Sequence, residues 1–92
     1  MAEIVYEGGL RRLRIAGTCT ARESAAVREA VEHYGRSAPR LTVDLTGVAT
    51  IASEVASALV SSVDDVEAAG CRVTILRKRE SHVDRALREL HR

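Results

Sequence analysis

Short apolar and alternating stretches recur along this chain with the spacing of β-strands. Residues 4–6 and 10–15 flank a Glu-Gly-Gly sequence, which predicts a β-hairpin whose second strand turns Leu13 and Ile15 inward. Residues 41–45 alternate apolar with polar side chains and predict a third strand. The nearly continuous apolar and β-branched stretch that follows the chain's last glycine predicts a fourth strand, placed in the interior of the sheet.

Between these stretches, apolar residues repeat at the three- and four-residue spacing of an amphipathic helix. The repeats predict one helix over residues 22–34, a longer one whose apolar face begins at Val55 and which ends at Gly70, and a last one over residues 81–90. The unit from residue 41 to residue 76 has the length of a parallel strand-helix-strand crossover. We predict an α/β fold with a mixed sheet of about four strands and with helices packed mainly on one face.

The composition fits one small domain over residues 1–92. Hydrophobic residues make up 46% of the chain, which suffices for a core, but Tyr6 and Tyr34 are its only aromatic residues, so a base-stacking surface is not expected. The 14 basic and 13 acidic residues leave a net charge of +1, too little to attract nucleic acid or an anionic membrane. No apolar run approaches the roughly 20 residues of a membrane span, and no signal-peptide pattern is visible. We expect a cytoplasmic protein.

The residue types that most often carry chemistry show no catalytic or metal-binding spacing. His33, His82 and His91 form no HExxH-like pattern and pair with no cysteine, which favours surface histidines on helices. Cys19 and Cys71 lie far apart and in no CxxC pair, so we expect small buried side chains rather than a disulfide. No glycine-rich phosphate loop opens a helix. We therefore expect a non-catalytic protein without metal or cofactor.

The most distinctive segment is VDLTGVATIASEVASAL, residues 43–59, where the third strand meets the second helix. It resembles the STAS domain, the family of anti-sigma factor antagonists, in which a strand reading V-D-L-S-x-V precedes an apolar residue and then D-S-S-G-L at a helix start. The strand half matches as far as the apolar Ile51. The stretches IAG at 15–17 and AAGCRVTIL at 68–76 resemble further segments of the family. The resemblance covers nearly the whole chain and implies a STAS-like fold.

The helix half departs from the family pattern where phosphorylation takes place. Ala52 replaces the acidic residue, Ser53 keeps the first serine, and Glu54 occupies the position of the phosphorylated serine. In the antagonists that this chain resembles, the unphosphorylated serine permits docking onto an anti-sigma factor kinase, and phosphorylation releases it. Two interpretations of Glu54 stay open: a carboxylate that stabilises a helix start capped by Ser53, or a fixed substitute for phosphoserine. Ser53 is also a candidate for a shifted phosphorylation site.

The resemblance implies a protein-interaction module rather than an enzyme. Its contact surface is predicted between residues 50 and 57, with Thr50, Ser53, Glu54 and Ser57 as the partner-binding residues. The first hypothesis is an anti-sigma factor antagonist (anti-anti-sigma factor) in signal transduction and transcription regulation, which binds an anti-sigma factor kinase-like protein. The alternative is a STAS-like accessory subunit bound to the ATPase of a lipid-transport ABC system.

Three further expectations concern other partners. Neither nucleic acid binding nor membrane insertion is expected, for the reasons of charge and hydropathy given above. The Ala- and Val-rich helices offer a surface through which a small domain can form a homodimer. A nucleotide ligand ranks last among the functions considered, because the sequence supplies no phosphate cradle.

Overall fold

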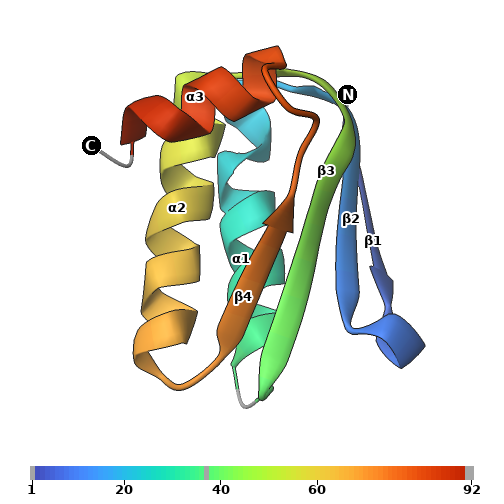
Figure 1. Cartoon of the computed structure of the whole chain (residues 1–92), viewed down its shortest axis with the longest axis vertical. Coiled ribbons are helices and arrows are strands. Elements are labelled where there is room, and N and C mark those ends of the chain that lie inside the picture. The colour runs from blue at the N-terminus through green and yellow to red at the C-terminus, as the bar shows by residue number, and fades with distance from the viewer. Residues whose placement is uncertain (1, 37, 91–92) are drawn as a thin grey trace.

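The computed structural model describes residues 2–36 and 38–90, and its elements follow the predicted order (Figure 1). The hairpin is confirmed, but Leu10 belongs to a short 3-10 turn, Gly8–Leu10, rather than to the second strand. A second 3-10 turn precedes the first α-helix. The strands and helices are β1 (Ala2–Glu7), β2 (Arg12–Cys19), α1 (Ser24–Gly35), β3 (Arg40–Ile51), α2 (Ser53–Ala68), β4 (Arg72–Leu76) and α3 (His82–Leu90).

The four strands form one mixed sheet in the order β1-β2-β3-β4. β1 pairs antiparallel with β2, whereas β2 with β3 and β3 with β4 pair parallel. A helix joins the strands of each parallel pair, because parallel neighbours need a crossover connection. Figure 1 shows α1 and α2 side by side along one face of the sheet, with α3 across one end. The predicted α/β fold is confirmed.

The hydrophobic core lies between the sheet and the helices. Leu13 and Ile15 are buried, as predicted, whereas the intervening Arg14 is exposed on the opposite face of the sheet. Leucine and valine dominate the large side chains that are almost fully buried: Leu13, Ile15, Leu41, Leu59, Leu87, Val27, Val31, Val43 and Val55. Within residues 2–36 and 38–90, no helix combines the length and hydrophobicity needed to cross a bilayer.

β4 is an edge strand, which corrects its predicted interior position. Its burial alternates: Val73 and Ile75 are partly buried on the helix side, whereas Arg72, Thr74 and Leu76 are exposed. The β-branched Thr74 suits both an edge and an interior strand. Sequence pattern therefore identifies the strand but not the number of its neighbours, because edge and interior strands bury the same face under a helix layer.

β3 is longer than predicted: it continues past residue 45 to Ile51, and over this span its pairing with β2 is irregular. The register shifts between Arg14 and Ala16 and again between Gly17 and Thr18, so β3 carries extra residues over this span. Asp44 supports the first irregularity. Its Oδ1 accepts hydrogen bonds from the Thr46 N–H at 2.9 Å and from the Thr46 hydroxyl at 2.6 Å.

We expect Asp44→Ala to lower the free energy of unfolding by about 1–2 kcal/mol, because the Thr46 N–H and hydroxyl lose their acceptor. Burial opposes ionisation of Asp44, but the hydrogen bonds from Thr46 and the charges of Arg12 and Arg14 outweigh it and lower the pKa of Asp44. The stabilisation that ionised Asp44 gives the folded chain is therefore present at neutral pH and is lost as the pH falls through the pKa of Asp44 in the folded state. Urea unfolding at pH 7 checks the loss. Asp65→Ala, which removes an exposed carboxylate, is the control, and equal losses in both variants would contradict the assignment.

Candidate partner-docking site

A single residue, Ala52, connects β3 to α2 and is held by backbone hydrogen bonds on both sides. Ala52 is extended (φ −70°, ψ 149°), and its N–H donates to the Cys19 carbonyl oxygen at 2.8 Å, which ties the connection to the end of β2. Its carbonyl oxygen accepts from the N–H groups of Val55 and Ala56 at 3.0 and 3.1 Å. The side chains of Val55 and Ala56 are buried. The first turn of α2 is therefore fixed by the core beneath it.

Ser53 does not cap α2, contrary to the prediction. The N-cap is Ala52, which makes no side-chain cap hydrogen bond, and Ser53 is the first helical residue. β3 runs as far as Ile51, so the extended residue before the helix is an alanine rather than a serine. The Ser53 hydroxyl instead donates to Glu54 Oε1 at 3.2 Å. Glu54 lies exposed in the first turn, where the helix dipole favours a carboxylate by about 0.3–1 kcal/mol.

Three of the four predicted contact residues, Ser53, Glu54 and Ser57, line one shallow groove between α2 and α1. Thr50 does not: it is exposed near the end of β3, paired with Thr18 of β2. We call this groove the docking groove, and its residues are Ser24, Arg28, Ser53, Glu54, Ser57, Ala58 and Ser61.

The docking groove presents opposite charges among small hydroxyl side chains. Glu54 supplies the carboxylate on α2, and Arg28 supplies a guanidinium on α1. Arg28 is only weakly engaged within the chain, since its nearest carboxylate oxygen, on the exposed Asp65, is 3.9 Å away. A shallow groove of this kind suits the surface of another protein better than an enclosed small molecule, which needs a deep and mostly apolar pocket.

His82 links α3 to the end of β3, a contact that the sequence pattern did not reveal. Its Nε2 lies 3.2 Å from the Ile51 carbonyl oxygen, where a protonated Nε2 donates to the residue just before Ala52. The two residues are 31 positions apart, so only the fold brings them together. His33 and His82 are both exposed on helices, as predicted, and His91 lies outside the described residues.

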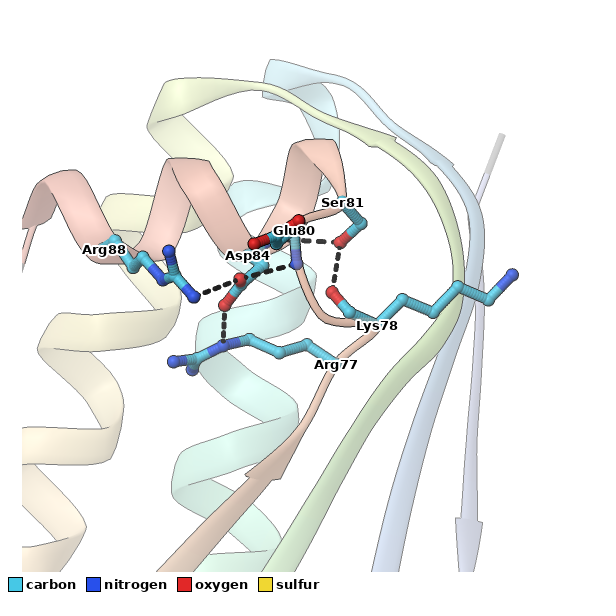
Figure 2. A network of polar contacts seen from close by, with 6 residues as sticks. All are labelled: Arg77, Lys78, Glu80, Ser81, Asp84 and Arg88. Carbon is cyan, nitrogen blue, oxygen red and sulfur yellow. Dashed lines mark hydrogen bonds and ion pairs between the residues drawn. The ribbon is translucent and has the colours of Figure 1, made fainter.

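The start of α3 is held by a polar network around Asp84 (Figure 2). The Asp84 side chain is only 4% exposed and accepts hydrogen bonds from Arg77 Nε at 2.7 Å and the Glu80 N–H at 2.9 Å, while the Arg88 guanidinium lies 3.0 Å away. The Glu80 N–H, followed by Arg77, lowers the pKa of Asp84. Ser81 caps the helix, because its Oγ accepts a hydrogen bond from the Asp84 N–H at 3.2 Å. The network therefore sets the position of the helix end that reaches β3.

The two cysteines take no part in this site. Cys19 and Cys71 are free and buried, as predicted. Burial raises the pKa of both thiols, which keeps them in their unreactive protonated form. In the part of the chain that the structure describes, no group of three or more His, Cys, Asp or Glu side chains is placed to hold a metal ion.

A family model described as "Mlab, STAS domain" matches residues 7–91, which is nearly the whole chain. The chain belongs to the STAS domain family. The family predicted from the strand-to-helix segment is thereby confirmed. A comparison with curated protein sequences found no match.

The fold of this STAS domain is similar to part of a solved structure titled "Crystal Structure Analysis of Mglu". The TM-score is 0.62, with 19% identity over 86% of this chain and 20% of that chain. The STAS domain thus spans one fifth of the length of that protein, and a likeness at this level of identity concerns the fold alone.

The two positions of the STAS domain that stand at the serine pair of the family pattern, Ser53 and Glu54, are exposed on the docking groove. Both can therefore be reached by a partner protein or a modifying enzyme. The next two residues, Val55 and Ala56, turn into the core and hold that pair in place.

Proposed function

We propose that this STAS domain is a non-catalytic interaction module of the anti-sigma factor antagonist type, which docks its partner through the docking groove. The observation that carries this proposal is the position of Glu54. It lies exposed in the first turn of α2 and lines the groove, where the resembled antagonists carry their phosphorylated serine. A charge at such a place faces the partner, and interfacial charges decide which partners are accepted.

Glu54 makes the charge at this position permanent. Its single negative charge and two oxygens reproduce part of a phosphate, which carries about −1.5 to −2 charge and three acceptor oxygens. The docking groove therefore behaves constitutively: it either resembles the released, phosphorylated state at all times or fits a partner that accepts the acid. The guanidinium of Arg28 on the opposite side of the groove favours a partner that brings both a basic and an acidic group.

Ser53 supplies the remaining hydroxyl at the helix start. Its Oγ lies 3.2 Å from Glu54 Oε1, so a phosphate on Ser53 stands directly beside a carboxylate. The added charge repels any acidic group that a partner places there. Ser53 is thus the residue through which a kinase can still switch a groove whose usual phosphoacceptor is replaced.

One observation favours a second candidate function, that of an accessory subunit on the ATPase of a lipid-transport ABC system. The matching family model bears the name Mlab rather than that of an antagonist. A subunit of that kind needs no phosphate switch, which agrees with Glu54 in place of a serine. The same docking groove serves both functions, so the identity of the captured partner separates them.

The experiment is affinity capture with the tagged protein from lysate of its own cells, beside Glu54→Ser and Glu54→Lys, with partners identified by mass spectrometry. We expect capture of an anti-sigma factor kinase-like protein that changes with residue 54. With that partner purified, Glu54→Lys is expected to change the Kd by at least about tenfold. Glu29→Lys, on the exposed side of α1 away from the docking groove, is expected to leave it within about twofold.

Two results would overturn the antagonist proposal. Capture of an ABC ATPase establishes the second function instead. If the wild type, Glu54→Lys and Glu29→Lys bind the captured partner with equal affinity, the docking groove is not part of the interface. In the antagonist case, Glu54→Ser treated with the partner kinase is expected to lose binding that the untreated variant retains, because the substitution restores the phosphoacceptor.

A further inference from the structure

β4 lies at one edge of the sheet, and its outer side has no partner strand among the described residues. Some of its backbone N–H and C=O groups point outward, where another strand could pair with them. The Arg72 N–H donates to the Pro39 carbonyl oxygen at 3.1 Å, so this residue directs its backbone toward the neighbouring chain segment at β3. Because backbone groups alternate in direction along a strand, Val73 and Ile75 present their N–H and C=O groups outward. An edge of this kind is a template for another strand.

A groove with an apolar floor runs beside this edge, between β4 and α2. Val73 and Ile75 form its floor on the strand side, and Val60 and Val63 form it on the helix side. All four are valine or isoleucine, and together they offer an apolar contact next to the open backbone edge. We call this the edge groove.

The two ends of the edge groove carry opposite charges. Asp64 and Glu67, from the last turns of α2, lie at the end where β4 begins, because α2 runs opposite to β4. Arg77 and Arg79 follow the end of β4, and Arg88 of α3 joins them there. Asp84 pairs with Arg77 and Arg88 and offsets one of these three positive charges, so this end of the groove keeps a net positive charge. The charge of the groove lining therefore changes from negative beside the start of β4 to positive beside its end.

We propose that the edge groove is a self-association surface, in which β4 of a second copy of this chain pairs antiparallel with β4. Thr74 is the centre of the strand, and a twofold axis through it places Val73 opposite Ile75 of the second copy. These two residues then exchange hydrogen bonds through their outward N–H and C=O groups. The two sheets become one continuous sheet, as in an isologous dimer.

Charge complementarity selects a second copy as the occupant. In the antiparallel arrangement, the arginine end of one copy lies against the Asp64 and Glu67 end of the other, and the twofold axis repeats the match. The groove beside the other edge strand, β1, lacks this property. Its ionisable side chains are Glu29, His33 and two tyrosines, with neither Lys nor Arg, so it offers no positive end of comparable strength.

This surface is separate from the docking groove. Ser53, Ser57 and Ser61 face the docking groove at four-residue spacing, whereas Val60 and Val63 face the edge groove from a different side of α2. The dimer therefore leaves the docking groove open, and its test does not depend on the identity of any other partner.

The first test is a cysteine crosslink at the twofold axis. Directly opposed residues that are not hydrogen-bonded to each other have Cα atoms about 4.5 Å apart in an antiparallel pair, which is within the span of a disulfide. We expect Thr74→Cys to form a disulfide-linked dimer under mild oxidation. Val5→Cys, at an exposed position of the β1 edge, is the matched control and is expected to stay monomeric, as is the wild type with its buried cysteines.

The second test is charge exchange measured by sedimentation equilibrium on the full chain. Glu67→Arg is expected to weaken dimerisation by about tenfold, since the substitution changes two symmetry-related contacts. Adding Arg79→Glu in the same chain is expected to restore it.

Three outcomes overturn the proposal: a wild type that sediments as a monomer at its highest attainable concentration, no crosslink from Thr74→Cys in a folded variant, or equal crosslinking from Val5→Cys. A dimer that forms unchanged in Glu67→Arg shows association through another face, such as the helices.

Discussion

Replacing Asp84 with Ala is expected to lower the Tm by about 10 °C or more, because several polar groups around this buried carboxylate lose their partner. The carboxylate is almost fully buried and serves Arg77, Arg88 and the Glu80 N–H together. Removing it leaves a partly buried guanidinium without its partner and a backbone N–H without its acceptor. Glu80 has a left-handed backbone, φ 57°, and its N–H bond to Asp84 holds this turn at the start of α3.

The pH dependence of this effect has a definite sign. The pKa of Asp84 is lowered in the folded chain, first by the Glu80 N–H and then by Arg77. A lowered folded pKa means that the stabilisation is present above the unfolded pKa and disappears as the pH falls through the folded value. The Tm difference between the wild type and Asp84→Asn is therefore expected to shrink below about pH 4, where the unfolded carboxyl also becomes protonated.

Thermal unfolding followed by circular dichroism at pH 7 and pH 3 measures both effects. Asp65→Ala is the matched control, because it removes an exposed carboxylate from the neighbouring helix α2. A Tm of Asp84→Ala equal to that of Asp65→Ala, or a Tm difference between wild type and Asp84→Asn that does not change with pH, would show that the network in Figure 2 contributes nothing to the stability of α3.

Gly35→Leu is expected to lower the free energy of unfolding by about 2–3 kcal/mol, because the end of α1 packs directly against α2. Gly35 is buried, and a Cβ at this position would lie 3.0 Å from Val66 Cγ1 and 3.1 Å from its Cβ and Cγ2. These distances are shorter than ordinary van der Waals contact, so a larger side chain separates the helices or strains their rotamers. The expected loss of stability comes from steric overlap with Val66 and not from the backbone conformation of Gly35.

Chemical denaturation of Gly35→Leu, Val66→Ala and the double variant tests this contact. Val66→Ala makes room beside Gly35, so the double variant is expected to lose less stability than the sum of the single variants. Gly9→Leu is the control, since a Cβ at Gly9 meets nothing within 4 Å. Additive losses in the double variant would place the strain of Gly35→Leu somewhere other than the Val66 contact.

Periodicity in the sequence was sufficient to predict the order of the strands and helices and the faces that they bury. Leu13 and Ile15 point into the core as the alternation indicates, and the helices cover one face of the sheet. The place of a strand in the sheet and the residue at which it ends were harder to predict than whether a segment forms a strand or a helix. β4 lies at the edge, and β3 continues past its predicted end through irregular pairing that Asp44 supports. Hydrophobic pattern reports which face of a strand is buried, but neighbours and bulges depend on the rest of the sheet.

The candidate docking site was predicted in part. The strand-to-helix segment pointed to Ser53, Glu54 and Ser57, which share the docking groove, whereas Thr50 lies outside it. The predicted role of Ser53 as N-cap was wrong, because β3 ends at Ile51, Ala52 takes the N-cap position and Ser53 is already the first residue of the helix. Arg28 was not predicted as a part of the site, since α1 meets α2 only in the folded chain.

The spacing of residues close together in the sequence thus predicted the strands, the helices and their buried faces, and a short motif predicted the STAS family. The contacts that link distant segments arose from packing. His82 reaches Ile51 across 31 positions, Val66 leaves little room for a side chain at position 35, and the charged ends of the edge groove come from α2, α3 and the loop after β4. Local periodicity depends on neighbours along the chain, whereas these contacts depend on how the sheet and helices pack, which no single segment specifies.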